Sequence, residues 1–204
     1  MLKRYLTSGI LAGICVGLGG SVFLGSDNRY VGAGLFSVGL IAICYLGYSL
    51  FTGRVGFIVA VHGREEISEL LLCLLGNLIG ACAMGFAIAY ALPSRAEKAL
   101  DMCTAKLQMP LGSVFVCALF CGILMYLAVV LFKEKQSVLG ILFCVPAFIL
   151  SGFEHSIADM FYFAVAGIVS LQAFVFIWLV ILGNALGGML MPALRLLMGG
   201  RKNA

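Results

Sequence analysis

The sequence predicts an all-α integral membrane protein with six transmembrane helices, of which the second and the fifth are broken. Of its 204 residues, 63% are hydrophobic and only 11% are charged. The mean hydropathy is +1.13, so the chain has too little polar surface to cover a water-soluble globule. Its apolar residues form continuous runs without alternating polar positions, which favours helices over a membrane barrel. We expect residues 1–204 to form a single transmembrane domain.

Four of the six expected spans are uninterrupted apolar runs. A helix needs roughly 20 apolar residues to cross the hydrocarbon core of a bilayer. Runs of this size occupy residues 6–24, 70–92, 111–132 and about 167–194. The first run has no convincing small-residue cleavage site, so we interpret it as a span and not as a signal peptide. Residues 94–108 form the longest polar connection.

The second span is expected to break near its end. It starts at about residue 31 and runs to Leu50, where it meets Phe51, Thr52, Gly53 and Arg54. The apolar residues 55–61 that follow are too few to cross a bilayer alone. The pattern indicates a helix interrupted at membrane depth.

The fifth span contains a group of polar residues between two apolar runs. Residues 138–150 and 160–169 are apolar, and Glu154, His155 and Asp159 lie between them. Ionisable groups at membrane depth are costly, so they usually mark a pathway or a site. The alternative is a purely structural break, in which backbone groups satisfy the polar side chains.

The two halves of the chain resemble each other, which predicts an inverted repeat. The first break, residues 49–53, precedes a span with Gly-Asn-x-x-Gly at Asn77. The second break, residues 151–155, precedes a span with the same pattern at Asn184. The halves cover about residues 1–93 and 94–204.

The distribution of basic residues predicts that both termini are cytoplasmic. Six spans place both ends on one side, and eight Lys or Arg residues fall on that side against four on the other. The first group comprises Lys3, Arg4, Arg64, Lys133, Lys135, Arg195, Arg201 and Lys202, and the second comprises Arg29, Arg95, Lys98 and Lys106. Cytoplasmic segments carry the excess of basic residues, so we expect a multi-pass protein of the inner or cell membrane.

Composition argues against several other kinds of site. The net charge is only +4, and the basic residues are too dispersed for a nucleic-acid surface. The eight cysteines lie mostly inside apolar runs, with no CxxC pair and no histidine at ligand spacing. We therefore expect no cofactor, no metal site and no disulfide framework.

Three motifs together resemble the formate/nitrite transporter family. They are GFEHSIADMF at residues 152–161, LFTG at residues 50–53, and the paired strings GNLIG and GNALGG. The resemblance covers nearly the whole chain. It implies an aquaporin-like fold assembled as a homopentamer in the lipid bilayer, with one pore in each protomer. It also implies transport of small monovalent anions, such as formate, nitrite, lactate or hydrosulfide, and no enzymatic activity.

The resemblance also assigns roles to individual residues. His155 matches the central pore histidine, and Thr52 matches the threonine that faces it. Lys106 matches a vestibule lysine that attracts anions. Hydrophobic constrictions fall at Phe36, Leu40 and Phe148, with Leu50 and Phe51 beside the threonine. Asn184 matches a polar residue near the pore, and Asn77 is its counterpart in the other half.

The chemistry of these residue types fits a weak-acid substrate. A neutral imidazole can exchange a proton with a weak acid because its unperturbed pKa is about 6.5. An anion can then cross the driest part of the pore as a neutral acid. Glu154 is expected to hold the broken helix by accepting backbone N–H bonds, because a second anion in the pore would repel the substrate.

Three positions depart from the family pattern. Asp159 and Arg54 stand where the family usually has neutral residues, and Gly122 stands where an Asn is expected. The chain also lacks the family's long N-terminal amphipathic segment and extended loop before the sixth span. A single charge at membrane depth costs roughly 2.5 to 3.5 kcal/mol on insertion scales. We therefore expect Arg54 and Asp159 to form an ion pair.

The leading hypothesis is a channel or proton-linked transporter for small monovalent weak-acid anions of the formate or nitrite type. A hydrosulfide or lactate channel of the same family is an alternative. An intramembrane enzyme would need Glu154 and His155 together with Cys144 or Cys103, but these residues do not recur at a chemically useful spacing. A structural membrane subunit with a closed pore is the third possibility.

Overall fold

The computed structural model describes residues 2–60 and 63–199, and every regular element within these ranges is helical. Five helices in these ranges are long and apolar enough to cross a membrane. They are α1 (Leu2–Gly25), α2 (Arg29–Leu46), α4 (Arg64–Ala91), α6 (Leu111–Lys135) and α9 (Leu171–Leu197). Two shorter apolar helices are α7 (Leu139–Leu150) and α8 (Ser156–Val165). The predicted all-helical, multi-pass membrane architecture is confirmed at this level.

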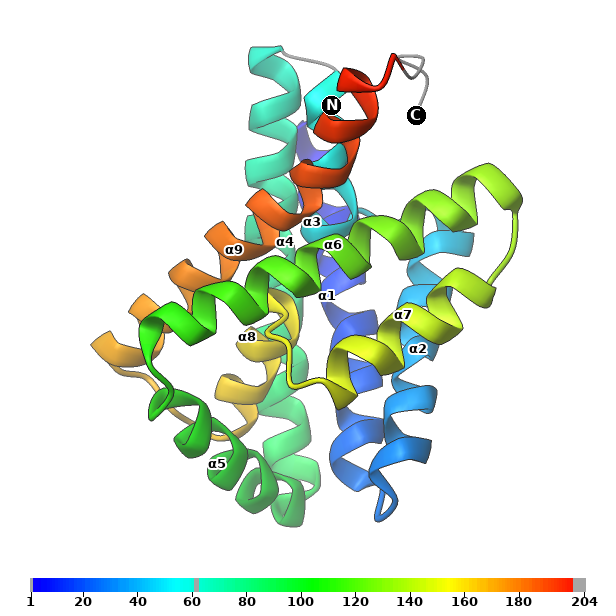
Figure 1. Cartoon of the computed structure of the whole chain (residues 1–204). Helices are drawn as coiled ribbons and strands as arrows, with labels where there is room; N and C mark the ends of the chain where they lie inside the picture. Colours follow the sequence, from blue (N-terminus) through cyan, green and yellow to red (C-terminus); the bar gives the residue numbers. More distant parts are fainter. Residues whose placement is uncertain (1, 61–62, 200–204) are drawn as a thin grey trace.

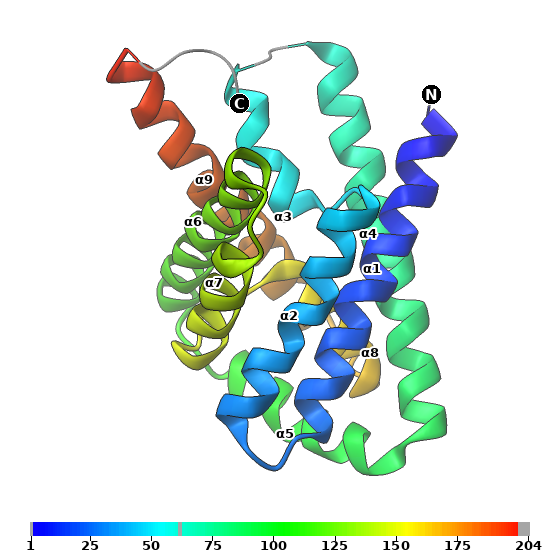
Figure 2. The same ribbon diagram turned by 90° about the vertical axis from the view of Figure 1, so that its right-hand side faces the viewer.

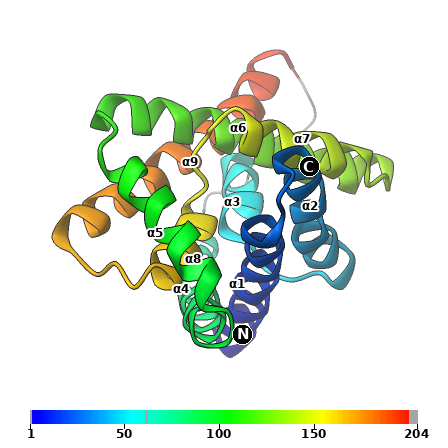
Figure 3. The same ribbon diagram turned by 90° about the horizontal axis from the view of Figure 1, so that it is seen from below.

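The helices form two groups that face each other. In Figure 2, α1, α2 and α4 stand on one side, and α6, α7 and α9 stand on the other. The most extensive pairings are α1 with α4 and α6 with α9. Seen from below in Figure 3, α8 and the short α3 (Phe51–Arg54) lie in the middle of the molecule. The start of α1 and the end of α9 lie at the same end (Figure 1).

Non-helical residues lie at both positions where the sequence predicts a break. Helix α2 stops at Leu46, and Gly47 adopts a left-handed conformation with φ +68°. Helix α3 follows at Phe51 and continues into the 3₁₀ helix η1 (Val55–Ala60). In the second half, α7 is followed by Gly152 at φ +71° and then by α8. Glycine suits both turns because it lacks the Cβ that disfavours positive φ.

The expected polar connection at residues 94–108 is helical. This segment is helix α5 (Pro93–Leu107), with proline at its first position, where a missing N–H has no cost. Its inward residues Ala99 and Cys103 are fully buried. The helix lies at the lower end of the molecule in Figures 1 and 2. Low hydrophobicity excluded a span here, but it did not exclude an amphipathic helix.

Gly122 has a packing role that the sequence comparison did not suggest. A Cβ built on Gly122 would collide with the backbone carbonyl oxygen of Asn184, because α6 and α9 touch at this point. Gly13 makes the same kind of contact with the carbonyl of Asn77 between α1 and α4. Small residues commonly allow such close approach between membrane helices. An asparagine at position 122 would not fit without separating the two helices.

Candidate functional site

His155 and Thr52 meet at the centre of the molecule. Thr52 Oγ1 lies 2.9 Å from His155 Nε2. Thr52 is fully buried in α3, and His155, only 3% exposed, directly precedes α8. The two side chains are 103 positions apart in the chain. The fold therefore brings together the two residues that the sequence predicts to face each other.

The surroundings of His155 determine which ring nitrogen carries the proton. His155 Nδ1 accepts a 3.1 Å hydrogen bond from the backbone N–H of Ala158, so the ring caps the N-terminus of α8. A backbone N–H can only donate, so Nδ1 must carry a lone pair. In the neutral ring the proton is then on Nε2, which donates to Thr52 Oγ1. The imidazole thus donates from Nε2–H to Thr52 in α3 and accepts at Nδ1 from the start of α8.

Two buried asparagines support the two interrupted regions in the same way. Asn77 Oδ1 accepts from the backbone N–H of Phe51, at the start of α3, over 2.8 Å. Asn184 Oδ1 accepts from the backbone N–H of Ser156, at the start of α8, also over 2.8 Å. Both side chains are fully buried. Each asparagine therefore satisfies a backbone donor that the start of a helix leaves without a partner.

The donor groups of the two asparagines repeat the pattern. Asn77 Nδ2 donates to the carbonyls of Gly9 and Ser49, each over 2.9 Å. Asn184 Nδ2 donates to the carbonyls of Ala118 and Glu154, each over 2.8 Å. Each amide thus ties its short helix to the first long helix of its own half.

These hydrogen bonds correct the register of the internal comparison. The sequence comparison sets residues 49–53 beside residues 151–155. The hydrogen bonds instead align Phe51 with Ser156, and therefore Leu50 with His155, which are the N-cap residues of α3 and α8. Thr52 lies two residues after Leu50, the position equivalent to His155. The two members of the central pair therefore occupy different positions in their two halves.

Aromatic and aliphatic side chains surround the central pair. The ring of Phe148 stacks on His155, with centroids 5.6 Å apart and planes inclined by 21°. Phe36 meets Phe148 edge to face at 6.1 Å. The other expected constriction residues, Leu40, Leu50 and Phe51, are also buried. These side chains therefore limit the access of water to the face of the imidazole that Phe148 covers.

Two pockets approach the centre from opposite ends of α2. The first, here called the vestibule, has a volume of about 450 Å³. Its lining includes Phe23, Arg29, Lys106, Phe148, Glu154, His155, Asp159 and Tyr162. The second, here called the upper pocket, has a volume of about 170 Å³. Its lining includes Leu40, Gly47, Leu50, Arg54, Val129 and Lys133. The vestibule reaches the first residues of α2 and the upper pocket reaches the last.

Lys106 lies in the vestibule between two carboxylates. Its Nζ forms an ion pair with Glu154 Oε2 and lies 3.1 Å from Asp159 Oδ1. Burial alone would lower the pKa of Lys106, but the Asp159 and Glu154 carboxylates outweigh it and raise that pKa. The ammonium therefore stays charged. Its charge is already matched by protein carboxylates, which weakens it as an attractor for a free anion.

Glu154 does not have the role that the sequence suggests. We expected its carboxylate to accept backbone N–H bonds, but the side chain instead pairs with Lys106. The backbone carbonyl of Glu154 helps to hold the break, because it accepts from Asn184. The sequence placed Lys106 in the vestibule, but its pairing with Glu154 was not expected because 48 residues separate the two.

The predicted ion pair between Arg54 and Asp159 is wrong. Arg54 Nη2 lies 3.7 Å from Glu69 Oε2, and the guanidinium packs over the Tyr5 ring, 4.8 Å from its centroid. Arg54 lines the upper pocket, whereas Asp159 lines the vestibule. Helices α3 and α8 start together at the centre and run toward opposite ends. A residue that follows the first break therefore lies far in space from a residue that follows the second.

Comparison with known proteins identifies the family. The family model described as formate/nitrite transporter matches residues 1–198. The chain belongs to the formate/nitrite transporter family. A solved structure titled "FNT family ion channel" has a TM-score of 0.85 and 25% identity, over 98% of this chain and 91% of that one. A second, titled "Pentameric formate channel with formate bound", has a TM-score of 0.76 and 22% identity, over 97% and 95%.

Relatives in sequence are also named as transporters. "Uncharacterized transporter YrhG" from Bacillus subtilis (strain 168) is 32% identical over 152 residues, which are 67% of this chain and 57% of that protein. "Nitrite transporter NirC" from Salmonella typhimurium (strain LT2) is 28% identical over 182 residues, 79% of this chain and 68% of that protein. The chain thus spans somewhat more than half of the length of YrhG.

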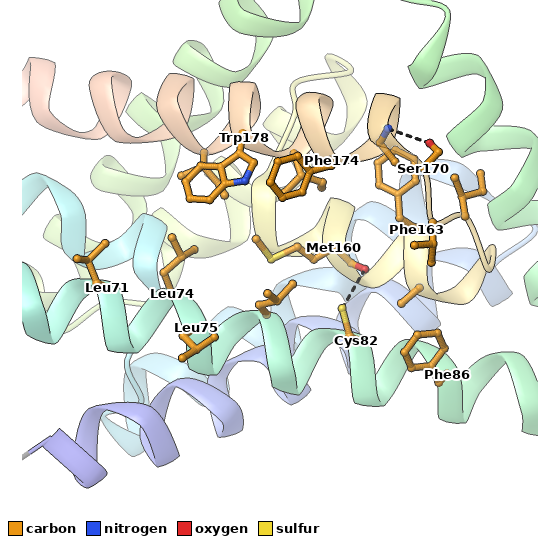
Figure 4. A pocket seen from close by; sticks show the side chains of 17 residues that line it. Leu71, Leu74, Leu75, Cys82, Phe86, Met160, Phe163, Ser170, Phe174 and Trp178 are labelled. Carbon is orange, nitrogen blue, oxygen red and sulfur yellow. Dashed lines mark hydrogen bonds between the residues drawn. The ribbon is translucent and has the colours of Figure 1, made fainter.

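This member of the formate/nitrite transporter family has a further pocket, of about 460 Å³, away from the central pair. It lies between α4, α8 and α9, and Figure 4 shows Trp178, Phe174 and Met160 pointing into it. The hydroxyl of Ser170, at its edge, already accepts from the backbone N–H of Ala173. The pocket has little to offer a small anion and is not a candidate substrate site.

Arg29 is a vestibule residue that the sequence placed only in a turn. Its Nη2 donates to the carbonyls of Ile149 and Leu150 at 3.3 and 3.5 Å, across the end of α7. These contacts fix a cation at the rim of the vestibule. Nothing in the local sequence pointed to this role, because the contact joins residues 120 positions apart.

Proposed function

We propose that the protein is a channel or proton-linked transporter for small monovalent weak-acid anions of the formate or nitrite type. The observation that carries the proposal is the buried His155–Thr52 pair between the vestibule and the upper pocket. Aromatic and aliphatic side chains enclose this pair. Membership of the formate/nitrite transporter family supports the same kind of substrate.

We infer that each half of the chain contributes three spans to one transmembrane domain. In this view α2 with α3 and η1 forms the second span, and α7 with α8 forms the fifth. The equivalent pairings of α1 with α4 and of α6 with α9 support an inverted repeat of about residues 1–93 and 94–204. The matched hydrogen bonds of Asn77 and Asn184 support it independently.

The anion path runs from the vestibule, past the ring of Phe148, to the central pair. There His155 Nε2–H and the Thr52 hydroxyl are the hydrogen-bond donors that an anion can use. The buried side chains Phe36, Leu40, Leu50 and Phe51 keep this region dry, so an anion crosses more easily after it has gained a proton. On the far side it enters the upper pocket, beside Arg54 and Lys133.

Proton exchange at His155 has a structural cost. A second proton can bind only at Nδ1, which caps α8 through the N–H of Ala158. Protonation must therefore break a cap worth about 1 kcal/mol. The imidazole thus serves mainly as a hydrogen-bond donor at neutral pH, and it accepts a proton when an adjacent anion offsets this cost.

The assembly and orientation follow from the family and from the charge distribution. We propose a homopentamer with one pore in each protomer, as for the pentameric formate channel that shares this fold. We further propose that both termini face the cytoplasm and that the protein lies in the inner or cell membrane. Of the eight basic residues that support this orientation, Arg201 and Lys202 lie outside the described residues, and the other six lie within them.

A flux panel tests the proposal. The purified protein is placed in proteoliposomes, and uptake of formate, nitrite, lactate and hydrosulfide is measured over roughly pH 5 to 8. Flux of at least one anion above that of protein-free liposomes is expected. Absence of flux for all four, with the protein correctly inserted, would favour a structural membrane subunit.

A further inference from the structure

We propose that Asp159 and Glu154 together bind one titratable proton beside Lys106, and that this proton sets the net charge of the vestibule. The two carboxylates share a single ammonium group: Lys106 pairs with Glu154 and lies 3.1 Å from Asp159 Oδ1. With both carboxyl groups ionised, the three side chains carry a net charge of −1.

This charge is poorly exposed to water. The side chains of Lys106, Glu154 and Asp159 are 16%, 3% and 2% exposed. Removing an ion from water costs several kcal/mol, and a single partner can offset this cost for only one of two carboxylates. A buried carboxyl group without its own counter-charge avoids the cost by taking up a proton. The cluster is therefore expected to be neutral, with one carboxyl group protonated.

Asp159 is the better site for this proton. Its Oδ1 faces Lys106, but Oδ2 has no hydrogen-bond partner among the described residues and is shielded from solvent. An ionised carboxylate oxygen that is buried without donors costs more free energy than a neutral carboxyl group in the same place. Glu154 directs Oε2 at the ammonium and is the closer of the two partners.

Among the residues that the structure describes, the remaining groups around Asp159 do not supply a second positive charge inside the cluster. Cys103 from α5, Cys121 from α6 and Tyr162 from α8 interact with it electrostatically, and all three are ordinarily neutral at pH 7. From α4, the Cys82 thiol reaches the carbonyl of Met160. His155 lines the vestibule with its Nδ1 engaged at Ala158, and Arg29 is held at the rim by the end of α7.

The consequence for transport rests on the proposed function. With the proton bound, the vestibule cluster is neutral and an anion can pass it. Without the proton, the net charge of −1 repels an anion at the same place.

The proton itself can be tested without any transport. Infrared difference spectra of the full-length protein are recorded as the pH is raised. In the wild type, the C=O band of a protonated carboxylic acid should be present and should disappear on titration. Asp159→Asn and Glu154→Gln should each abolish the band, because either change leaves one carboxylate for one ammonium. Asp101→Asn, which alters an exposed carboxylate on the same helix as Lys106, should leave it unchanged.

Persistence of the band in Asp159→Asn, or its absence from the wild type across the titration, would overturn the proton site. If Asp159→Asn does not fold, Glu154→Gln decides the same question. Both variants are checked by gel filtration against the wild type before the spectra are compared.

The effect on the vestibule is tested by anion flux in proteoliposomes. Asp159→Asn should match the wild type near pH 5 and exceed it by about tenfold near pH 8, the effect of one charge at roughly 10 Å in a dielectric constant of about 20. Identical pH profiles for the two proteins would overturn the charge effect. If the wild type carries no anion at all, the proposed function fails, whereas the infrared result still decides whether the proton is there.

Discussion

The hydroxyl of Thr52 and Nε2 of His155 lie 2.9 Å apart, although the two residues come from opposite halves of the chain. The contact forms because α3 and α8 both begin at the centre of the molecule. His155 precedes α8 as its N-cap, while Thr52 lies within α3. The His155 side chain therefore has two roles: Nδ1 caps α8, and Nε2 faces Thr52 in α3.

Replacement of His155 can separate these two tasks. Asn is a strong N-cap residue, so His155→Asn should keep the hydrogen bond from Ala158 and the stability of α8. His155→Ala loses the cap and should destabilise the protein by about 1 kcal/mol. Thermal unfolding in detergent compares the two variants. Equal destabilisation by both would show that capping is not what His155 contributes.

The same variant tests proton exchange. Because the amide of Asn cannot take up a proton in this range, His155→Asn should lose the part of the increase in anion flux at falling pH that depends on protonation of the ring. Flux is measured in proteoliposomes between about pH 5 and 8. Thr52→Val is the matched change at the partner: it keeps the shape but leaves Nε2–H without an acceptor. An unaltered pH profile in His155→Asn would remove the ring from the proton pathway.

The resemblance to the formate/nitrite transporter family, carried by short motifs, predicted which residues meet at the centre. GFEHS and LFTG each contain one member of the central pair, and the Gly-Asn strings mark the asparagines that support α3 and α8. Hydropathy predicted the five long apolar helices. These features are local in the chain, so a single sequence reveals them.

Contacts between distant segments could not be predicted in the same way. The ion pair expected for Arg54 and Asp159 came from the cost of isolated charges, which is a sound premise. It did not say which partner each charge would find. The partner of Asp159 is Lys106 and the partner of Arg54 is Glu69. Each partner lies on a helix whose packing the sequence does not specify. Helix α5 was missed because its polar composition resembles that of a loop.

The constriction residues should behave differently from ordinary core residues. Phe148→Ala removes a ring that contacts both His155 and Phe36. A buried Phe truncated to Ala usually costs about 3 to 5 kcal/mol. We expect a smaller loss here, since the ring borders the vestibule and lacks packing partners on that side. Leakage of lactate relative to formate should rise.

Leu40→Ala tests the other side of the central pair, because Leu40 borders the upper pocket. Val180→Ala, at a fully buried position of α9, serves as a packing control. Flux selectivity and thermal stability are measured for all three variants. If Phe148→Ala and Leu40→Ala unfold as readily as the control and leave selectivity unchanged, these side chains are packing residues only.

The two asparagines should be equally important for folding. Asn77→Asp and Asn184→Asp keep the acceptor for Phe51 N–H and Ser156 N–H but remove two donor bonds each. Leaving buried carbonyls without donors costs about 1 to 3 kcal/mol for each group. Both variants should therefore give poor yields of folded protein. Near-normal stability of one variant only would argue against equivalent roles in the two halves.

Arg54 offers a test of charge at the upper pocket. Its side chain is 40% exposed, and its bridge to Glu69 is long at 3.7 Å. Exposed pairs of this kind contribute about 0 to 1 kcal/mol. Arg54→Gln should therefore leave stability and assembly nearly unchanged. Lys133 borders the same pocket, so on the proposed function Arg54 adds to a local positive charge that would draw anions toward the upper end.

We expect Arg54→Gln to slow anion entry from the upper end severalfold at low ionic strength, with the difference shrinking as salt is added, because salt screens exposed charges. Arg64→Gln is the matched control, since Arg64 is an exposed cation at the start of α4 and does not border the upper pocket. Oriented proteoliposomes with the anion on one side at a time provide the measurement. Misassembly of Arg54→Gln would instead mean that the guanidinium holds α3 against α1 and α4 through Tyr5 and Glu69. Equal effects from Arg54→Gln and Arg64→Gln would mean that only the overall charge of this end matters.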